Sequence, residues 1–123
     1  MANERAQKRL SAVLAADVVG YSRLMAQDEE GTLAAVKVVH QELFDPHFDQ
    51  HGGRLVKTTG DGLLAEFPSV LDAVRCCVDV QEGLAKRAAT APESKRLQFR
   101  IGINLGDIII DGDDIYGDGS VPP

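Results

Sequence analysis

A chain of 123 residues has the length of a single domain, and 44% apolar with 26% charged residues is the composition of a folded protein rather than a disordered one. The net charge of -6 argues against a nucleic-acid partner, because nucleic acids are usually bound by a basic surface. The two cysteines, Cys76 and Cys77, are adjacent, which excludes a disulfide framework or a cysteine zinc site and is typical of reduced thiols in a cytoplasmic protein.

The first half of the chain predicts a buried strand followed by a long helix. Residues 10–19 are apolar apart from Ser11 and Asp17, which favours a strand with Asp17 near its carboxyl end. A helix then opens with carboxylates at Asp28, Glu29 and Glu30, and Pro46 is expected to kink or break it. No run approaches the roughly 20 apolar residues of a membrane span, so we expect no membrane contact.

The second half predicts a hairpin, a helix and one or two further strands. Strands over 54–59 and 63–67 flank Gly60-Asp61-Gly62, which has the composition of a hairpin turn. A helix should follow, with one apolar face, and 88–95 should be a loop. Alternation over 98–105 indicates a strand, and 108–110 form a second strand or a bent extension. The helical face is predicted to consist of Val70, Val74, Cys77, Val80 and Leu84.

Two carboxylates stand out by their positions in these elements. Asp17 ends an apolar strand, and Asp61 lies at a hairpin tip, so the two acids can meet at one edge of a sheet if their strands are neighbours. Two nearby carboxylates repel unless a cation lies between them, and a hard divalent ion prefers oxygen ligands. For Asp61, the alternative is a simple turn residue, which Asp-Gly often provides. Asp17 needs a partner in either case.

The segment that follows the first strand is a candidate phosphate-binding loop. A strand that leads through Val19, Gly20, Tyr21 and Ser22 into a helix can present backbone N–H groups to a phosphate. Many strand–turn–helix joints share this composition, and neither the P-loop pattern nor the dinucleotide-binding fingerprint is present. This segment alone therefore does not identify a nucleotide-binding protein.

Four segments together resemble the class III adenylate/guanylate cyclases. They occur in the order and at the spacing of that family, and they span nearly the whole chain: Asp17–Ser22 (DVVGYS), Lys57–Gly62 (KTTGDG), Phe99–Gly106 (FRIGINLG) and Asp114–Gly117 (DIYG). The resemblance implies an α/β (α+β sandwich) fold, with a ferredoxin-like βαββαβ core and helices on one face of the sheet. This agrees with the predicted element order.

The resemblance also implies a role for each matching residue. Asp17 and Asp61, with the carbonyl of Val18, match the ligands of two divalent cations, Mg²⁺ or Mn²⁺. The triphosphate of ATP would lie against Val19, Gly20, Tyr21 and Ser22. Adenine would be read by Lys57 and Asp114, with Ile115 beside them. In the family these groups meet in a homodimer, where one subunit gives the metal ligands and its partner gives the base-reading pair.

The last residues depart from the family pattern. The family continues with an Asn that orients the ribose and an Arg that stabilises the transition state, whereas Val121 stands at the Asn position and the Arg position lies beyond Pro123. We therefore interpret 1–123 as one partial cyclase domain, incomplete at its C-terminus, with a flexible start (1–8) and an irregular tail (117–123). Such a chain is expected to be nearly inactive. The alternative is a non-catalytic module that binds nucleotide or partners only.

One further feature resembles a metal site but is not interpreted as one. His47 and His51 are four residues apart and could share a helical face, as metal-ligand pairs do. Pro46 disturbs that helix, and the sequence offers no obvious third ligand. We therefore expect solvated histidines.

Overall fold

The computed structural model describes residues 6–93, 96–111 and 114–117, with side chains described for 10–93 and 96–106. Its elements are, in order, β1 (Ala6–Val18), α1 (Tyr21–Gln27), α2 (Glu29–Val39), the π-helix η2 (His40–Phe44), α3 (Asp45–Gln50), β2 (Arg54–Thr59), β3 (Gly62–Phe67), α4 (Val70–Thr90), β4 (Phe99–Asp111) and β5 (Asp114–Gly117). No helix in this part of the chain is long and apolar enough to cross a membrane.

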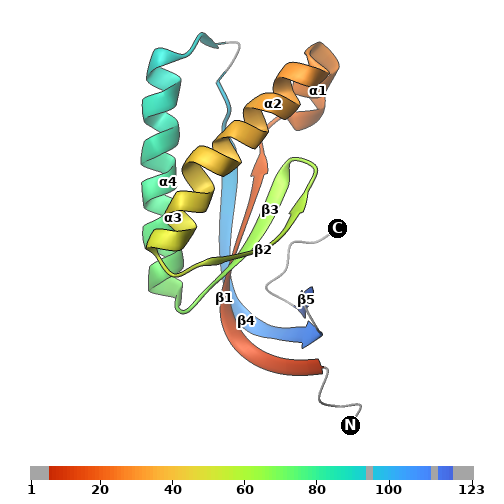
Figure 1. Cartoon of the computed structure of the whole chain (residues 1–123), viewed down its shortest axis with the longest axis vertical. Helices are drawn as coiled ribbons and strands as arrows, with labels where there is room; N and C mark the ends of the chain where they lie inside the picture. The colour runs from red at the N-terminus through yellow and green to blue at the C-terminus, as the bar shows by residue number, and fades with distance from the viewer. Residues whose placement is uncertain (1–5, 94–95, 112–113, 118–123) are drawn as a thin grey trace.

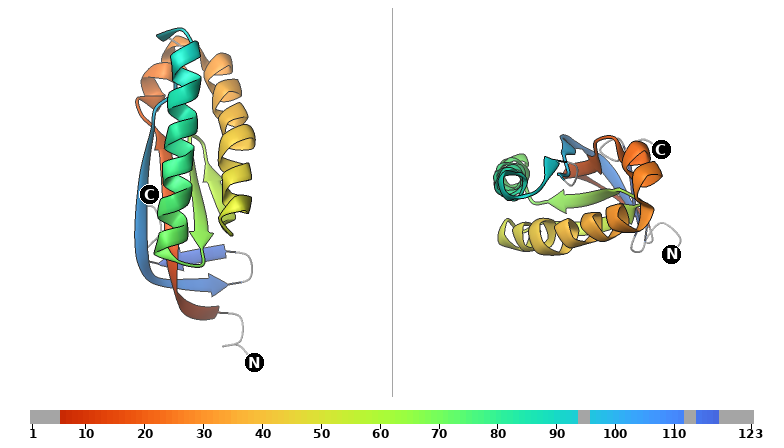
Figure 2. Two further views of the ribbon diagram at one scale, coloured as in Figure 1. Left: turned by 90° about the vertical axis from the view of Figure 1, so that its left-hand side faces the viewer. Right: turned by 90° about the horizontal axis from the view of Figure 1, so that it is seen from above.

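The strands form one antiparallel sheet in the order β2-β3-β1-β4-β5. The first four strands, with the helices that connect them, form the βαββαβ arrangement predicted from the sequence, and β5 adds a hairpin at the β4 edge. The run α2–η2–α3 and the long α4 lie side by side on one face of the sheet (Figures 1 and 2). The ferredoxin-like fold class is therefore confirmed.

The hydrophobic core lies between the helices and that face of the sheet. Alternate residues of β1 and β3 point into it, as do Phe99, Ile101 and Ile103 of β4, whose alternation the sequence revealed. Phe44 of η2 is fully buried at its centre, and its ring centroid lies 5.1 Å from that of Phe99 and 5.9 Å from that of Phe48. These contacts fix the helical layer over the strands that carry the candidate site.

Two predictions about helix boundaries were wrong, and the structure decides between the two alternatives left open for 108–110. Pro46 does not break the helical run, because the chain widens into the π-turn η2 and Pro46 then occupies the first turn of α3, where its missing N–H is not needed. The predicted loop over 88–95 begins later, since α4 continues to Thr90. Residues 108–110 are the extension of β4, not a separate strand.

The predicted core face of α4 was also partly wrong. The structure buries Ala73 and Cys76 beside Val80 and Leu84, whereas Val70 and Val74 are 38% and 41% exposed. Apolar residues of α4 cover more than the width of the face that meets the sheet, and packing selects the side that includes the small Ala73. Cys77 is only partly buried at the border of the core.

The two predicted irregular ends lie mostly outside the described residues. Within the predicted flexible start, 1–8, β1 already begins at Ala6, and within the predicted tail, 117–123, Gly117 is the last residue of β5. Val121 lies outside the described residues. The interpretation of 1–123 as a partial domain stays a prediction.

Candidate active site

The β2–β3 hairpin brings Asp61 to the end of β1. The tip has only two residues, Gly60 and Asp61, between the paired Thr59 and Gly62. From there the Asp61 carboxylate reaches β1, where its Oδ2 accepts a hydrogen bond from the backbone N–H of Val18 at 3.1 Å. Val18 directly follows Asp17, so the hairpin tip with Asp61 lies beside the end of β1 that carries Asp17. That the two carboxylates share cations stays a prediction.

Two glycines permit this close approach of the hairpin to β1. Gly60 has φ +48°, a left-handed conformation that closes a two-residue hairpin and is costly for residues with a Cβ. A Cβ atom at Gly62 would lie 3.0 Å from the carbonyl oxygen of Ala16 and 2.8 Å from Thr59 Oγ1. Any side chain there would push the hairpin, and Asp61 with it, away from β1.

Asp17 projects from the sheet face that the helices do not cover, on the same side of β1 as Val13. Its direct neighbour across β4 is Arg100, whose Nε donates to Asp17 Oδ1 at 2.9 Å. The sequence analysis predicted that Asp17 needs a partner but did not find Arg100. Both side chains reach solvent, with exposures of 39% for Asp17 and 73% for Arg100, so the pair is a screened ion pair that can open.

The predicted phosphate loop forms the turn from β1 into α1. Val19 is anchored, because its N–H donates to the carbonyl of Gln98 at 2.8 Å, and Gly20 adopts φ +68°. No side chain caps the N-terminus of α1, which starts at Tyr21. A guanidinium lies beside the loop, since a Cβ at Gly20 would be only 2.9 Å from Arg23 Nη2.

A surface cavity of about 650 Å³ opens beside this loop. It is lined by Val19, by the guanidinium groups of Arg23 and Arg96 and by one carboxylate, Glu93, together with Leu24, Gln27 and Gln98. The two guanidinium groups outnumber the carboxylate, which suits an anionic ligand.

The predicted base-reading residues lie on the two edge strands. Lys57 is exposed on β2, next to an irregularity in its pairing with β3, while Asp114 and Ile115 lie on β5. The side chains of Asp114 and Ile115 lie outside the described ones. Their pairing with Lys57 therefore stays a prediction.

The chemistry of the donor set at Asp17 and Asp61 fits divalent cations. Each carboxylate has one oxygen in a hydrogen bond, with Arg100 or with the Val18 N–H, and a second oxygen that can bind a ligand. Oxygen donors at the edge of a sheet are what Mg²⁺ and Mn²⁺ prefer. The half-exposed position of Asp17 leaves a path for ions from solvent.

Comparison with known proteins assigns the family. The family model of the adenylate and guanylate cyclase catalytic domain matches residues 4–118. The chain belongs to this family, whose members use divalent metal ions. The sequence resemblance is thereby confirmed at the level of a class III cyclase domain.

Individual relatives agree with this assignment. The chain is 44% identical over 119 residues to a Rhizobium meliloti protein named "Putative adenylate cyclase 3", covering 97% of the chain and 20% of that protein. It is 47% identical to an adenylate/guanylate cyclase/hydrolase of Silicibacter pomeroyi whose crystal structure superposes with a TM-score of 0.85, covering 93% of the chain and 66% of that chain. The guanylyl cyclase Cya2, at 22% identity and a TM-score of 0.77, shares the fold, with coverage of 93% and 66%. The chain thus spans about a fifth of the curated relative.

Proposed function

We propose that this chain is part of an adenylate cyclase that converts ATP to cyclic AMP and pyrophosphate in the cytoplasm, using two divalent cations, Mg²⁺ or Mn²⁺, in a homodimer. The preference for ATP rests on Lys57 and Asp114, which match the adenine-reading pair of the family. The second candidate is a non-catalytic module that binds nucleotide or partners only. It is favoured by Val121 at the position of the family's Asn.

The reaction is an internal displacement at the α-phosphorus. The ribose 3′-oxygen forms a bond to that phosphorus and loses its proton, the bond to the bridging α–β oxygen breaks, and pyrophosphate leaves. Bound divalent cations supply acidification of the 3′-hydroxyl and neutralisation of the leaving pyrophosphate. No nucleophilic side chain is needed, so the task of the chain is to bind the cations and ATP and to orient the triphosphate.

Each residue of the site has a part in that task. Asp17 and Asp61 would hold the cations, with the carbonyl of Val18 as a further ligand. The Val18 N–H orients Asp61, whereas the exposed ion pair of Asp17 with Arg100 would open when Asp17 binds a cation. Val19, Gly20, Tyr21 and Ser22 would hold the triphosphate beside Arg23, whose positive charge attracts it.

The hydrogen bond from Val18 to Asp61 is the observation that carries the proposal. A turn residue needs no contact with a distant strand, yet Asp61 reaches 43 positions along the chain to the strand end that bears Asp17. The donor is a backbone N–H, so the bond holds the Asp61 carboxylate regardless of which side chain stands at position 18. This favours a metal-binding role for Asp61 over a simple turn.

The test is complementation between subunits. Residues 1–123 are mixed with the Silicibacter pomeroyi cyclase domain in which the aspartates aligned with Asp17 and Asp61 are replaced by Asn. With Mn²⁺ and ATP, we expect cyclic AMP only from the mixture, because this chain supplies the aspartates and its partner supplies the Asn and Arg. Residues 1–123 alone should be nearly inactive, since each such group is typically worth about 10² to 10³ in rate.

The controls separate the two candidate functions. Asp61→Asn in residues 1–123 should abolish the activity of the mixture, whereas Glu30→Gln, which removes an exposed carboxylate on α2, should not. A mixed dimer that binds ATP but makes no cyclic AMP would favour the non-catalytic module.

A further inference from the structure

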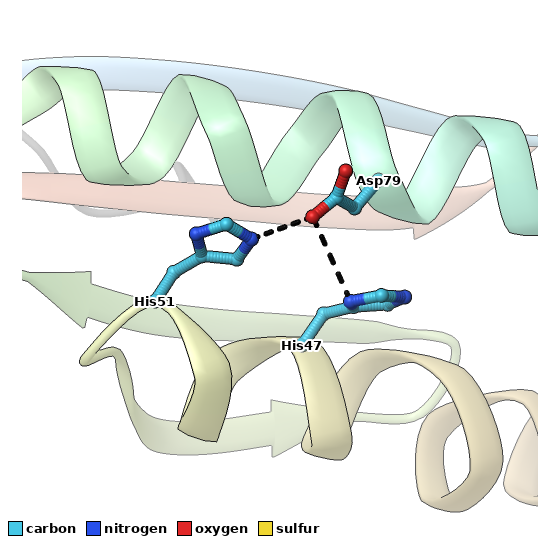
Figure 3. A group of neighbouring side chains, drawn as sticks. All are labelled: His47, His51 and Asp79. Atoms are coloured by element: carbon cyan, nitrogen blue, oxygen red, sulfur yellow. Dashed lines mark hydrogen bonds and ion pairs between the residues drawn. The ribbon is translucent and has the colours of Figure 1, made fainter.

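A second group of metal-ligand side chains lies in the helical layer, apart from Asp17 and Asp61. His47 projects from α3, His51 caps the C-terminus of α3, and Asp79 projects from α4 toward both (Figure 3). Among the described residues, this is the single group of three His, Cys, Asp or Glu side chains whose ligand atoms all lie within 4.8 Å of one another. The sequence offered no third ligand, because Asp79 is 28 positions beyond His51.

Both histidines turn a ring nitrogen toward the same carboxylate oxygen. His51 Nε2 lies 2.7 Å from Asp79 Oδ2, and His47 Nδ1 lies 3.9 Å from it. The two imidazole rings are 6.4 Å apart and inclined by 30°. The expectation of solvated histidines was therefore wrong for His51, whose side chain is only 13% exposed, because α4 packs over it.

We propose that His47, His51 and Asp79 bind a zinc ion. Two imidazoles and a carboxylate are a common zinc ligand set, with water as the fourth ligand. Tetrahedral zinc with bonds of about 2.1 Å holds its ligand atoms about 3.4 Å apart. Around such an ion, the distance of 3.9 Å from His47 Nδ1 to Asp79 Oδ2 would shorten, and that of 2.7 Å from His51 Nε2 would lengthen.

A simple hydrogen bond between His51 and Asp79 explains less of the arrangement. It needs neither His47 nor the convergence of a second ring nitrogen on Asp79 Oδ2. His47 Nδ1 lies 3.1 Å from Gln50 Oε1, so it donates to Gln50 in this structure. Zinc binding moves that proton to Nε2 and releases the Gln50 amide, because a metal takes the lone pair of the nitrogen.

The ligand types separate this site from the cyclase metal site. Imidazole suits zinc, copper and nickel, whereas Mg²⁺ binds mainly to oxygen. Cys76 of α4 is fully buried in the hydrophobic core, and neither it nor Cys77 belongs to the group of converging ligand atoms. Zinc at this place would join the end of α3 to α4 and stabilise the fold by mass action.

The experiment uses the chain of residues 1–123 freed of metal with EDTA and titrated with ZnCl₂ in a calorimeter. We expect one zinc ion per chain and a melting temperature that rises with zinc concentration. Asp79→Asn keeps a hydrogen-bond acceptor for His51 but removes the charged ligand. That variant, like His47→Gln, should bind zinc about tenfold more weakly or worse.

Two controls locate the ion. Glu82→Gln removes the same charge from an exposed position one turn further along α4 and should leave the affinity unchanged. Asp61→Asn removes a carboxylate of the cyclase site and should also leave it unchanged. Urea unfolding in EDTA verifies that Asp79→Asn folds. Wild-type affinity in Asp79→Asn, loss of zinc binding in Asp61→Asn, or no binding to the wild type would each overturn the proposal.

Discussion

The two faces of the sheet use the same strands for different purposes. On the helix-covered face, buried apolar residues from every layer pack around Phe44 and Phe99. On the other face, Val13 and Leu64 form a small buried apolar cluster among the described side chains, and ion pairs lie on the same face. One such pair joins Asp17 to Arg100, and another joins Arg54 to Glu66, which also accepts from Ser11. Changes on the first face should therefore affect folding, and changes on the second should affect chemistry.

The largest expected effect is on the helix-covered face. Phe44→Ala should lower the free energy of unfolding by about 3 to 5 kcal/mol, because it leaves a cavity against Phe48 and Phe99. Urea denaturation followed by circular dichroism measures this. If Phe44→Ala does not fold, the milder Phe44→Leu should still lower the free energy of unfolding by about 1.5 kcal/mol.

A control on the same helical layer sharpens that result. Leu33 of α2 is 46% exposed, so Leu33→Ala should change the free energy of unfolding by about 0.5 kcal/mol or less. Equal losses at Leu33 and Phe44 would show that the core does not lie where the structure has it.

Gly62→Ala is expected to have the next largest effect, at the junction of hairpin and β1. Its Cβ would meet the Ala16 carbonyl, and overpacking of this kind costs about 1 to 3 kcal/mol. The shift should also break the bond from Val18 to Asp61, so amide hydrogen exchange at Val18 should accelerate. Gly102→Ala is the matched control, because nothing lies within 4 Å of a Cβ there. Unchanged exchange at Val18 in Gly62→Ala would refute the proposed role of this glycine.

A smaller effect on stability should follow from removing Arg100. Exposed ion pairs contribute about 0 to 1 kcal/mol, so Arg100→Gln should unfold at nearly the same urea concentration as the wild type. The released Asp17 should then bind Mn²⁺ more tightly in the absence of nucleotide, which electron paramagnetic resonance of the free ion measures. Arg87→Gln breaks another exposed pair, with Glu42, and should leave Mn²⁺ binding unchanged. A lower Mn²⁺ affinity in Arg100→Gln would show that the ion pair with Arg100 does not compete with Mn²⁺ for Asp17.

The smallest expected effect is a pH dependence that His40 adds to the helix-covered face. Burial lowers the pKa of His40 below 6.5, against opposing effects of Asp45 and Asp61. Between the lowered pKa and 6.5, the unfolded chain binds more protons than the folded one, so the free energy of unfolding falls as pH drops through this window. His40→Met should flatten the slope in urea titrations at pH 5 to 7. An identical slope in both proteins would assign the dependence to other groups.

The sequence was sufficient where a local pattern determines the structure. Gly60-Asp61-Gly62 predicted the hairpin, because a two-residue turn demands glycine or similar residues. The apolar stretch before Asp17 predicted the strand, and the alternation of Phe99, Ile101 and Ile103 predicted which side of β4 is buried. The position of Asp61 beside the end of β1 followed once β1 and β3 were neighbours.

The rest depended on distances along the chain that no local pattern spans. Arg100 lies opposite Asp17 only because of the register between β1 and β4, and the residues of these two strands do not determine that register by themselves. Asp79 joins His51 only because of how α3 packs on α4. The choice of Cys76 rather than Cys77 as the core residue reflects a modest rotation of α4 about its axis, which an apolar surface wider than the contact leaves open.

The central place of β1 has a consequence for how the protein emerges from the ribosome. β1 is made before both of its neighbours, since one of its edges pairs with β3 and the other with β4, whose Arg100 follows Asp17 by 83 positions. During synthesis the edge of β1 that faces β4 must stay unpaired until residues 99–111 have left the exit tunnel. Such long-range pairing slows folding and exposes the nascent chain to aggregation, so chaperones that hold apolar segments have a natural target in β1.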